Sequence, residues 1–248
     1  MSDVTERPVL RWAWLGTVGY QAAWVLQREI ALARRSGSLT DDAVLLLEHP
    51  PVYTMGRTGE ARHLGAGPDA LVAAGAEFLE VDRGGSVTFH GPGQLVAYPI
   101  VRLNGIFPIP GHPAHGDVDR YLRALEAALI ATAAEYRVTV TRRPPYTGVW
   151  AGEEKLGAIG VKLAGGVTTH GVALNVATDL TWFDRVTPCG IDGAGVTSFE
   201  RLGAQGHTPH KVAPVLAGAL ASAFGCRLAD AGPLNALLRT VTAQATAA

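Results

Sequence analysis

One of the two cysteines in this chain, Cys189, stands in a short turn sequence, Pro188-Cys189-Gly190. Proline and glycine favour turns over core strands, so this context lifts the thiol to where a reactant could reach it. Lys155 opens an otherwise apolar run that ends at Val161. An ammonium beside a thiol in a partly dry pocket holds the thiol as the nucleophilic thiolate. The pair suggests nucleophilic catalysis; the alternative is that Cys189 is a small buried side chain, as most free cysteines are.

A second candidate group lies between Arg83 and Gln94, in the sequence RGGSVTFHGPGQ. It has neither the GxxxxGK[ST] spacing of a phosphate loop nor a GxGxxG fingerprint after a strand. Its backbone amides could instead hold an oxyanion or a carbonyl oxygen. His90 is a candidate proton shuttle, although a histidine before Gly-Pro can equally cap a turn.

The elements that must position these groups begin with a predicted hairpin. Strands over Leu156–Leu163 and Val167–Val176 flank Gly165-Gly166, which fits a two-residue turn. Regular pairing then sets Ala158 opposite Ala173, Ile159 opposite Val172 and Gly160 opposite Gly171. One face of the hairpin carries only alanines and glycines, so a ligand or another backbone could approach it closely; tight packing against a helix is the alternative.

Lys155 fits this hairpin only with an irregularity. Strict alternation would point Lys155 to the face opposite Ala158. A bulge at Gly157 would turn the lysine toward the small-residue face, because glycines inside strands often mark bulges.

The remaining pattern predicts an α+β fold, a single domain over residues 1–248 with a mixed β-sheet flanked by helices. Strands come in runs between helices and do not alternate regularly with them. Helices are expected over Tyr20–Arg35, Asp117–Tyr136, from the N-cap Thr208 and Pro209 through Phe224, and over Asn235–Ala248. Further strands are expected over Ala43–Leu47, Val52–Thr54, Ser86–Phe89, Leu95–Val101, Val138–Thr141 and Gly148–Ala151, and a loop over Gly105–Gly116.

Composition excludes several classes of function. The chain has a net charge of −1 and is 17% charged, so we expect no nucleic-acid partner. No apolar run approaches the roughly 20 residues that cross a bilayer, and the N-terminus resembles no signal peptide. Two cysteines form no disulfide framework, which favours a reducing cytoplasm. His112 and His115 have metal-like spacing without a third ligand nearby, so no metal site is expected. Cys226 follows an apolar helical run and is expected in the core.

Four segments together are similar to the lipoyl(octanoyl) transferase family. They are Arg83–Pro99 (RGGSVTFHGPGQLVAYP), Lys155–Leu163 (KLGAIGVKL), Thr169–Val176 (THGVALNV) and Pro188–Ser198 (PCGIDGAGVTS). The stretch Glu48–Arg57 (EHPPVYTMGR) fits the same family. The resemblance covers roughly residues 14–200.

This resemblance implies a fold similar to the catalytic domain of biotin and lipoate protein ligases. It implies transfer of an octanoyl group from octanoyl-acyl carrier protein to a lysine of lipoyl-carrying domains, those of 2-oxoacid dehydrogenase complexes and the glycine cleavage H protein. No cofactor and no ATP are implied. The family's acyl-thioester nucleophile matches Cys189, and its pKa-lowering lysine matches Lys155. Its acyl-binding residues match Arg83, Gly84, Gly85, Ser86, Val87, Thr88, Phe89, His90, Ala158, Ile159, Gly160, Gly171, Val172 and Ala173.

This sequence departs from the commoner family pattern at Gly157, where alanine is usual, and at Val172, where a larger residue is usual. Both positions fall at the acyl pocket that the resemblance implies.

Three other activities are alternatives. An ATP-dependent lipoate or biotin ligase would activate a free acid and need no thiol. A non-catalytic module would bind lipoyl domains or carrier protein without an acyl-enzyme. A cysteine hydrolase using His90 or His170 would release free fatty acid. For an acidic carrier partner, the candidate basic patch is Arg57, Arg142, Arg143 and Lys162, which could equally be ordinary surface charges.

Overall fold

A large mixed sheet forms the centre of the protein. The computed structural model describes residues 7–187, 195–236 and 238. The strand order is β14-β1-β2-β6-β12-β11-β10-β9, and β13 pairs with β11 outside this order. The bounds are β1 Val9–Thr17, β2 Asp42–Glu48, β6 Gln94–Ile100, β9 Thr141–Arg143, β10 Tyr146–Ala151, β11 Glu154–Ala164, β12 Val167–Asn175, β13 Gly195–Val196 and β14 Arg227–Ala229.

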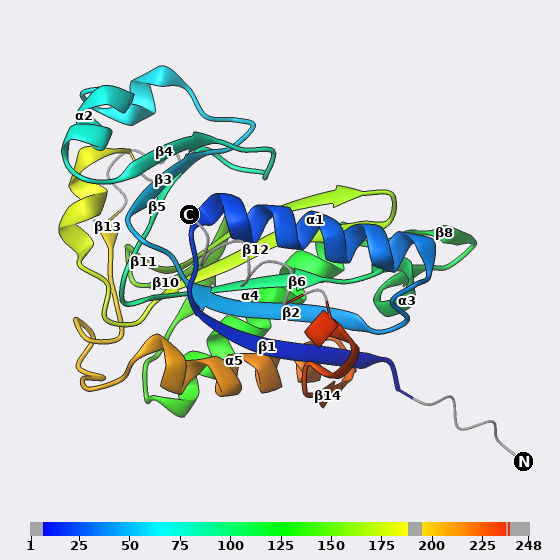
Figure 1. Ribbon diagram of the computed structural model, residues 1–248. Helices are drawn as coiled ribbons and strands as arrows, with labels where there is room; N and C mark the ends of the chain where they lie inside the picture. The colour runs from blue at the N-terminus through cyan, green and yellow to red at the C-terminus, as the bar shows by residue number, and fades with distance from the viewer. Residues whose placement is uncertain (1–6, 188–194, 237, 239–248) are drawn as a thin grey trace, which may run out of the picture.

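Three helices cover the two faces of this sheet (Figure 1). Helix α1 (Tyr20–Ser36) lies on one face, and α4 (Val118–Glu135) and α5 (Pro209–Ala223) lie together on the other. Local signals define their ends. Gly37 ends α1 in the left-handed conformation, at φ 82°. The side chains of Asp117 and Thr208 accept hydrogen bonds from backbone amides of the first turns of α4 and α5.

A smaller sheet lies over one end of the large one, at the upper left of Figure 1. It consists of β4 (Glu77–Glu80), β3 (Val52–Met55) and β5 (Val87–His90), in that order. Helix α2 (Pro68–Ala73) and the 3₁₀ segments Ala61–Leu64 and Leu180–Arg185 lie beside it. The glycine-rich segment connects this sheet to the large one. The amide of Gly84 donates to the carbonyl of Val161 on β11 at 2.9 Å.

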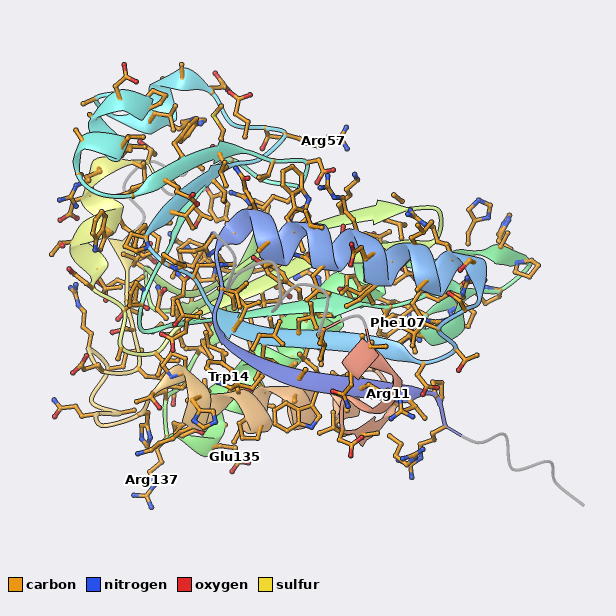
Figure 2. The ribbon with its side chains drawn as sticks, in the orientation of Figure 1. Arg11, Trp14, Arg57, Phe107, Glu135 and Arg137 are labelled. Atoms are coloured by element: carbon orange, nitrogen blue, oxygen red, sulfur yellow. The ribbon has the colours of Figure 1, made fainter. Side chains whose placement is uncertain are left out.

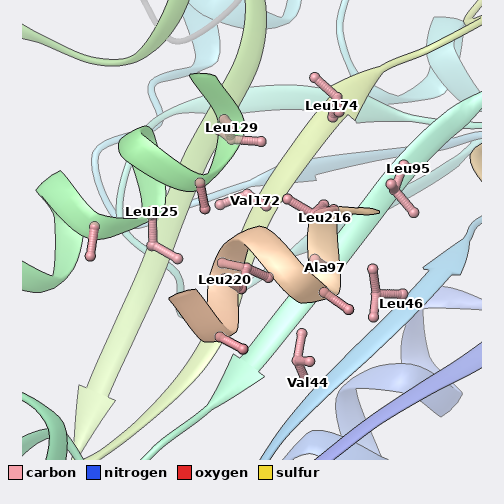
Figure 3. Close-up of a cluster of buried hydrophobic side chains, with 14 of the residues drawn as sticks. Val44, Leu46, Leu95, Ala97, Leu125, Leu129, Val172, Leu174, Leu216 and Leu220 are labelled. Atoms are coloured by element: carbon pink, nitrogen blue, oxygen red, sulfur yellow. The ribbon is translucent and has the colours of Figure 1, made fainter. Parts of the chain in front are cut away.

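The main core fills the space between the large sheet and α4 and α5 (Figure 3). Leu125 and Leu129 from α4 and Leu216 and Leu220 from α5 meet inward side chains of β2, β6 and β12, each fully removed from solvent or nearly so. A second cluster lies between α1 and the opposite face, around Leu26. Burial of a leucine side chain contributes about 1.5–3 kcal/mol, so these two layers fix the sheet that carries the site.

Most predicted elements are confirmed, as is the mixed sheet flanked by helices. Two predictions are wrong. The strand expected over Val138–Thr141 begins only at Thr141, because the amide of Val138 caps the end of α4 by donating to the carbonyl of Ala133. The expected loop Gly105–Gly116 instead contains the end of α3 (Leu103–Ile106) and a hairpin of β7 (Pro108–Ile109) and β8 (His112–Gly116). The sequence analysis also missed β1, β4 and α2.

Of the two predictions near the C-terminus, one is confirmed and the other falls mostly outside the described residues. Cys226 follows α5 and is buried in the main core, where burial raises the pKa of its thiol to about 12. Most of the predicted helix Asn235–Ala248 lies outside the described residues.

Candidate active site

A cavity of about 480 Å³ lies between the glycine-rich segment and the β11–β12 hairpin. Fourteen of the predicted site residues line it, from three separate stretches: Arg83 to Thr88 with His90, Lys155 with Ala158 to Gly160, and Gly171 to Ala173. Phe89 does not line it. Its ring stacks on Trp182 with centroids 5.1 Å apart and belongs to the core of the small sheet. The alternation of β5 explains this, because Thr88 and His90 face the cavity and the residue between them faces away.

The predicted hairpin register is confirmed. Ala158 pairs with Ala173, Ile159 with Val172 and Gly160 with Gly171. Both turn glycines have positive φ, 56° at Gly165 and 75° at Gly166, as a two-residue turn of this kind requires.

The interpretation of the small-residue face as a site of close approach is confirmed, for neighbouring backbone at the glycines and for the cavity at the alanines. A Cβ atom on Gly171 would lie 2.1 Å from the carbonyl oxygen of Ala97, and one on Gly160 would lie 2.9 Å from that of Gly84. These glycines admit close backbone approach. Ala158 and Ala173 instead line the cavity and leave it open. The two glycines thus let neighbouring backbone pack closely against the hairpin, and the two alanines form the surface of the hairpin that faces the cavity.

Lys155 reaches the same cavity as Ala158 because β11 is bulged. In the ladder to β10, Val149 pairs with Gly157 and Trp150 pairs with Lys155, so Leu156 is an extra residue on β11. The predicted bulge is therefore present, one residue before Gly157. It affects only the β10 side, since Gly157 pairs regularly with Leu174 on β12.

The Lys155 side chain is held in a largely dry position. It is 7% exposed, and Nζ lies 4.6 Å from the centroid of the Trp150 ring. Such a contact stabilises the ammonium by a cation–π interaction. Val196 of β13 pairs with Lys155, and the amide of Thr197 donates to the Lys155 carbonyl at 3.0 Å. The chain that follows residues 188–194 is therefore attached to the lysine-bearing strand.

Arg83 braces the glycine-rich segment against the small sheet. Its Nη2 donates to the carbonyl of Thr54 at 2.6 Å, and its Nη1 donates to the carbonyl of Gly84 at 3.0 Å. The sequence analysis did not identify Thr54 as a site residue, and no local signal links it to Arg83, because the contact is between distant segments.

His90 is fixed in one tautomer. Its Nδ1 lies 2.7 Å from Oε1 of Gln94, and Nε2 of Gln94 donates to Oδ1 of Asn175 at 2.9 Å. The amide oxygen of Gln94 therefore faces the ring, so Nδ1 carries the proton. Burial lowers the pKa of His90 well below its usual value, which keeps the ring neutral. Asn175 in turn donates to the carbonyl of Thr197 at 2.9 Å, which connects His90 to the strand beside Lys155.

The sequence analysis missed a polar group that lines the cavity beside His90. Tyr20 begins α1 and Tyr98 lies on β6, and both line the cavity with His170. The hydroxyl of Tyr98 lies 2.8 Å from Nε2 of His49, whose Nδ1 lies 2.6 Å from the carbonyl of Val18. His49 thus joins the turn before α1 to β6, the structural role expected of a residue that is fully buried.

His170 is held from both sides. Its Nε2 lies 2.9 Å from Oδ1 of Asp82, and its Nδ1 lies 3.3 Å from the hydroxyl of Tyr20. Asp82 also forms an ion pair with Lys162, so this carboxylate connects the glycine-rich segment to both strands of the hairpin. His170 adopts φ 57°, a conformation that costs energy for a residue other than glycine.

Three of the four residues of the candidate basic patch form ion pairs. Arg142 binds Glu126, which is fully buried, with Nε 2.8 Å from Oε2. Arg143 pairs with Glu153, and Lys162 pairs with Asp82. Figure 2 shows Arg57 projecting outward from the region of the small sheet. A charge reversal at Arg142 would therefore break a structural contact as well as change a surface charge.

Cys189 lies outside the described residues. The described chain stops at Thr187, whose amide donates to the carbonyl of His63 at 2.8 Å, and resumes at Gly195, which pairs with Glu154. Among the residues that the structure covers, no group of three or more His, Cys, Asp or Glu side chains is arranged to hold a metal ion. No helix in this same part of the chain is both long and apolar enough to cross a bilayer.

The fold and cavity define a class of protein, the catalytic domain shared with lipoate protein ligases. Lipoate-protein ligase A bound with ATP aligns with a TM-score of 0.67 at 14% identity, over 95% of this chain and 94% of that one. A bi-partite lipoate protein ligase from Thermoplasma acidophilum aligns with a TM-score of 0.66 at 15% identity, over 95% and 91%. At such low identity these likenesses establish the fold alone, which confirms the predicted fold class.

Closer relatives define the family. Residues 19–221 match the model of the lipoyl protein ligase A/B catalytic domain. An octanoyltransferase of Rubrobacter xylanophilus is 53% identical over 188 residues, which are 75% of this chain and 80% of the relative. An octanoyltransferase of Chloroflexus aggregans is 45% identical over 227 residues, 90% of this chain and 96% of the relative. The chain belongs to the lipoyl(octanoyl) transferase family, and it is an acyltransferase.

Proposed function

We propose that this enzyme transfers an octanoyl group from octanoyl-acyl carrier protein to a lysine of lipoyl-carrying domains, through a thioester on Cys189. The acceptors are the lipoyl domains of 2-oxoacid dehydrogenase complexes and the glycine cleavage H protein, and the reaction takes place in the cytoplasm without ATP. One observation carries the proposal. Lys155 lines one cavity together with thirteen of the residues that the family resemblance assigned to acyl binding, from three distant stretches of the chain.

The first step is attack of the Cys189 thiolate on the carrier thioester. A bond forms between Cys189 Sγ and the acyl carbon, the bond to the carrier sulfur breaks, and the leaving carrier thiolate takes a proton from the Lys155 ammonium, which leaves Lys155 neutral for the second step. Lys155 stabilises the thiolate; lowering a thiol pKa from about 8.5 to 7 requires only about 2 kcal/mol. Thioester exchange is close to energetically neutral, which is why no nucleotide is consumed. The segment that bears Cys189 continues into β13, and β13 pairs with β11 at Lys155, which supports the pairing of the two roles.

The second step forms the amide. The acceptor lysine attacks the acyl-enzyme as a neutral amine, the carbon–sulfur bond breaks, and the proton released from nitrogen passes to Lys155. Backbone amides of the glycine-rich segment are suited to hold the oxyanion. The alanines of the hairpin wall hold the acyl tail, and each buried methylene contributes about 0.8 kcal/mol.

The alternative is an ATP-dependent ligase acting on a free acid. Named octanoyltransferases match this chain at 42–53% identity, whereas the lipoate ligases share 14–15% with it, so the relatives favour transfer. The test is to incubate the enzyme with a lipoyl domain and either octanoyl-acyl carrier protein alone or octanoate with ATP. Octanoylation of the domain from the carrier without nucleotide supports the proposal. Octanoylation only from octanoate with ATP would assign the ligase, and release of free octanoate with acceptor in excess would assign a hydrolase.

A further inference from the structure

The end of the cavity away from Lys155 is polar. Lys155 and Gly160 are five residues apart on β11, about 16 Å along an extended strand. Gly160 pairs with Gly171, and the register to β6 sets Tyr98 beside Gly171, since Val172 pairs with Ala97. An extended octanoyl chain spans about 9 Å, because each of its seven bonds advances about 1.25 Å. A chain attached near Lys155 and lying along this wall therefore ends short of Tyr98.

The Tyr98 hydroxyl donates its proton to a hydrogen bond with His49. The carbonyl of Val18 can only accept, so Nδ1 of His49 donates to it at 2.6 Å. Burial lowers the pKa of His49 to about 4, so the ring is neutral and Nε2 carries a lone pair. The Tyr98 hydroxyl donates to this nitrogen at 2.8 Å. Its oxygen, which also lies within hydrogen-bond reach of the Tyr20 hydroxyl, can then only accept.

The Tyr20 hydroxyl likewise donates its proton to a hydrogen bond with His170. The carboxylate of Asp82 accepts from Nε2 of His170 at 2.9 Å, and burial lowers the pKa of His170, which keeps it neutral. Nδ1 therefore accepts from the Tyr20 hydroxyl at 3.3 Å. Burial raises the pKa of Tyr20 to about 12, so this hydroxyl stays protonated.

His90 supplies a third acceptor. Its proton lies on Nδ1, facing Gln94, so Nε2 carries a lone pair. The ring is 6% exposed and stacks on Tyr20 with centroids 5.9 Å apart.

Three buried acceptors thus line the cavity with their own protons directed elsewhere, and two of them, the hydroxyls of Tyr98 and Tyr20, lie at its end away from Lys155. We infer that this end is a subsite for a hydrogen-bond donor, which accepts the terminal hydroxyl of a hydroxylated medium-chain acyl group and disfavours an unsubstituted chain longer than octanoyl. A methyl group that enters this end of the cavity displaces hydrogen-bond donors from the acceptors and offers none in return. A terminal hydroxyl instead donates a hydrogen bond to one of the acceptors. The inference rests on the proposed function, since both concern the acyl group held in this cavity.

The test compares acyl N-acetylcysteamine thioesters as donors, with a lipoyl domain as acceptor. For the wild type we expect kcat/KM for decanoyl to fall about tenfold below octanoyl, and kcat/KM for 10-hydroxydecanoyl to exceed decanoyl about five- to tenfold, the range of one net hydrogen bond. Tyr98→Phe should bring the ratio of 10-hydroxydecanoyl to decanoyl close to one. Tyr121→Phe, which alters a buried tyrosine of the main core outside this cavity, is the matched control and should keep the ratio.

Each outcome separates the two claims. If the wild type transfers octanoyl but favours decanoyl over 10-hydroxydecanoyl, the subsite is refuted and the proposed function stands. If Tyr98→Phe keeps the wild-type ratio, the subsite is likewise refuted. If octanoyl itself is not transferred from either the thioester or the carrier, the proposed function fails. Tyr20→Phe serves as a second variant should Tyr98→Phe not fold, with the same expected loss of ratio.

Discussion

His49 should make the fold sensitive to acid, because it is buried neutral between the carbonyl of Val18 and the hydroxyl of Tyr98. Burial lowers its pKa from 6.5 to about 4. Between these values the unfolded chain binds a proton that the folded chain does not, so the free energy of unfolding falls as the pH drops from 6.5 toward 4 and is level above 6.5. The full loss is about 3.4 kcal/mol, and linkage gives about 2 kcal/mol at pH 5.

The assay is urea unfolding followed by tryptophan fluorescence at pH 7.5, 6 and 5. Burial also lowers the pKa values of His90 and His170, so the wild type should lose at least this much. The His49→Gln variant isolates one residue, because glutamine can donate and accept at the same two partners without titrating. Its loss between pH 7.5 and 5 should be about 2 kcal/mol smaller than that of the wild type.

His112→Gln is the control, since His112 is exposed on β8, and it should follow the wild-type pH dependence. Equal acid sensitivity of His49→Gln and the wild type would refute the reasoning, because the neutral state of His49 would then contribute nothing to the fold.

Three further substitutions, two of them paired with a control variant, test the site and the layers that hold it. Ala158→Leu fills about three methylenes of the cavity, so kcat/KM for octanoyl thioester should fall about 50-fold relative to butanoyl, at about 0.8 kcal/mol per methylene. Glu126→Gln removes the buried carboxylate that holds two arginines and the amide of β10, and should lower the free energy of unfolding by about 2 kcal/mol. Glu153→Gln, at an exposed pair, should change it by less than about 0.5 kcal/mol. Gly171→Ala should cost more than about 2 kcal/mol, because its Cβ would lie 2.1 Å from a carbonyl oxygen of β6, whereas Gly218→Ala has open space on α5 and should stabilise by up to about 1 kcal/mol.

The hairpin and the position of Lys155 were predictable from sequence because local rules decide them. A two-glycine turn fixes the pairing of the flanking strands, and a period of two then fixes which residues share a face. A glycine inside β11 marked the bulge, and the structure has it at the adjacent residue, Leu156. N-capping by Thr208 followed by Pro209 likewise determined where α5 begins.

The polar end of the cavity was not predictable because its members meet only through tertiary structure. Tyr20 looks like an ordinary first residue of a helix, and Tyr98 lies in a strand that is buried throughout, where no alternation distinguishes a cavity face from a core face. The Thr54–Arg83 contact joins two segments without any sequence signal. Phe89 was assigned to the acyl site with its neighbours as one stretch, although strand alternation turns it into the core of the small sheet.

The central claim is that the acyl group passes through Cys189. The most direct test is the intact mass of the enzyme after mixing with octanoyl-acyl carrier protein, for the wild type and for Cys189→Ser, with Cys226→Ser as a control at the buried cysteine. We predict a gain of one octanoyl group in the wild type and in Cys226→Ser, none in Cys189→Ser, and loss of the adduct when a lipoyl domain is added. An adduct that persists in Cys189→Ser, or octanoyl transfer by Cys189→Ser at the wild-type rate, would contradict the account.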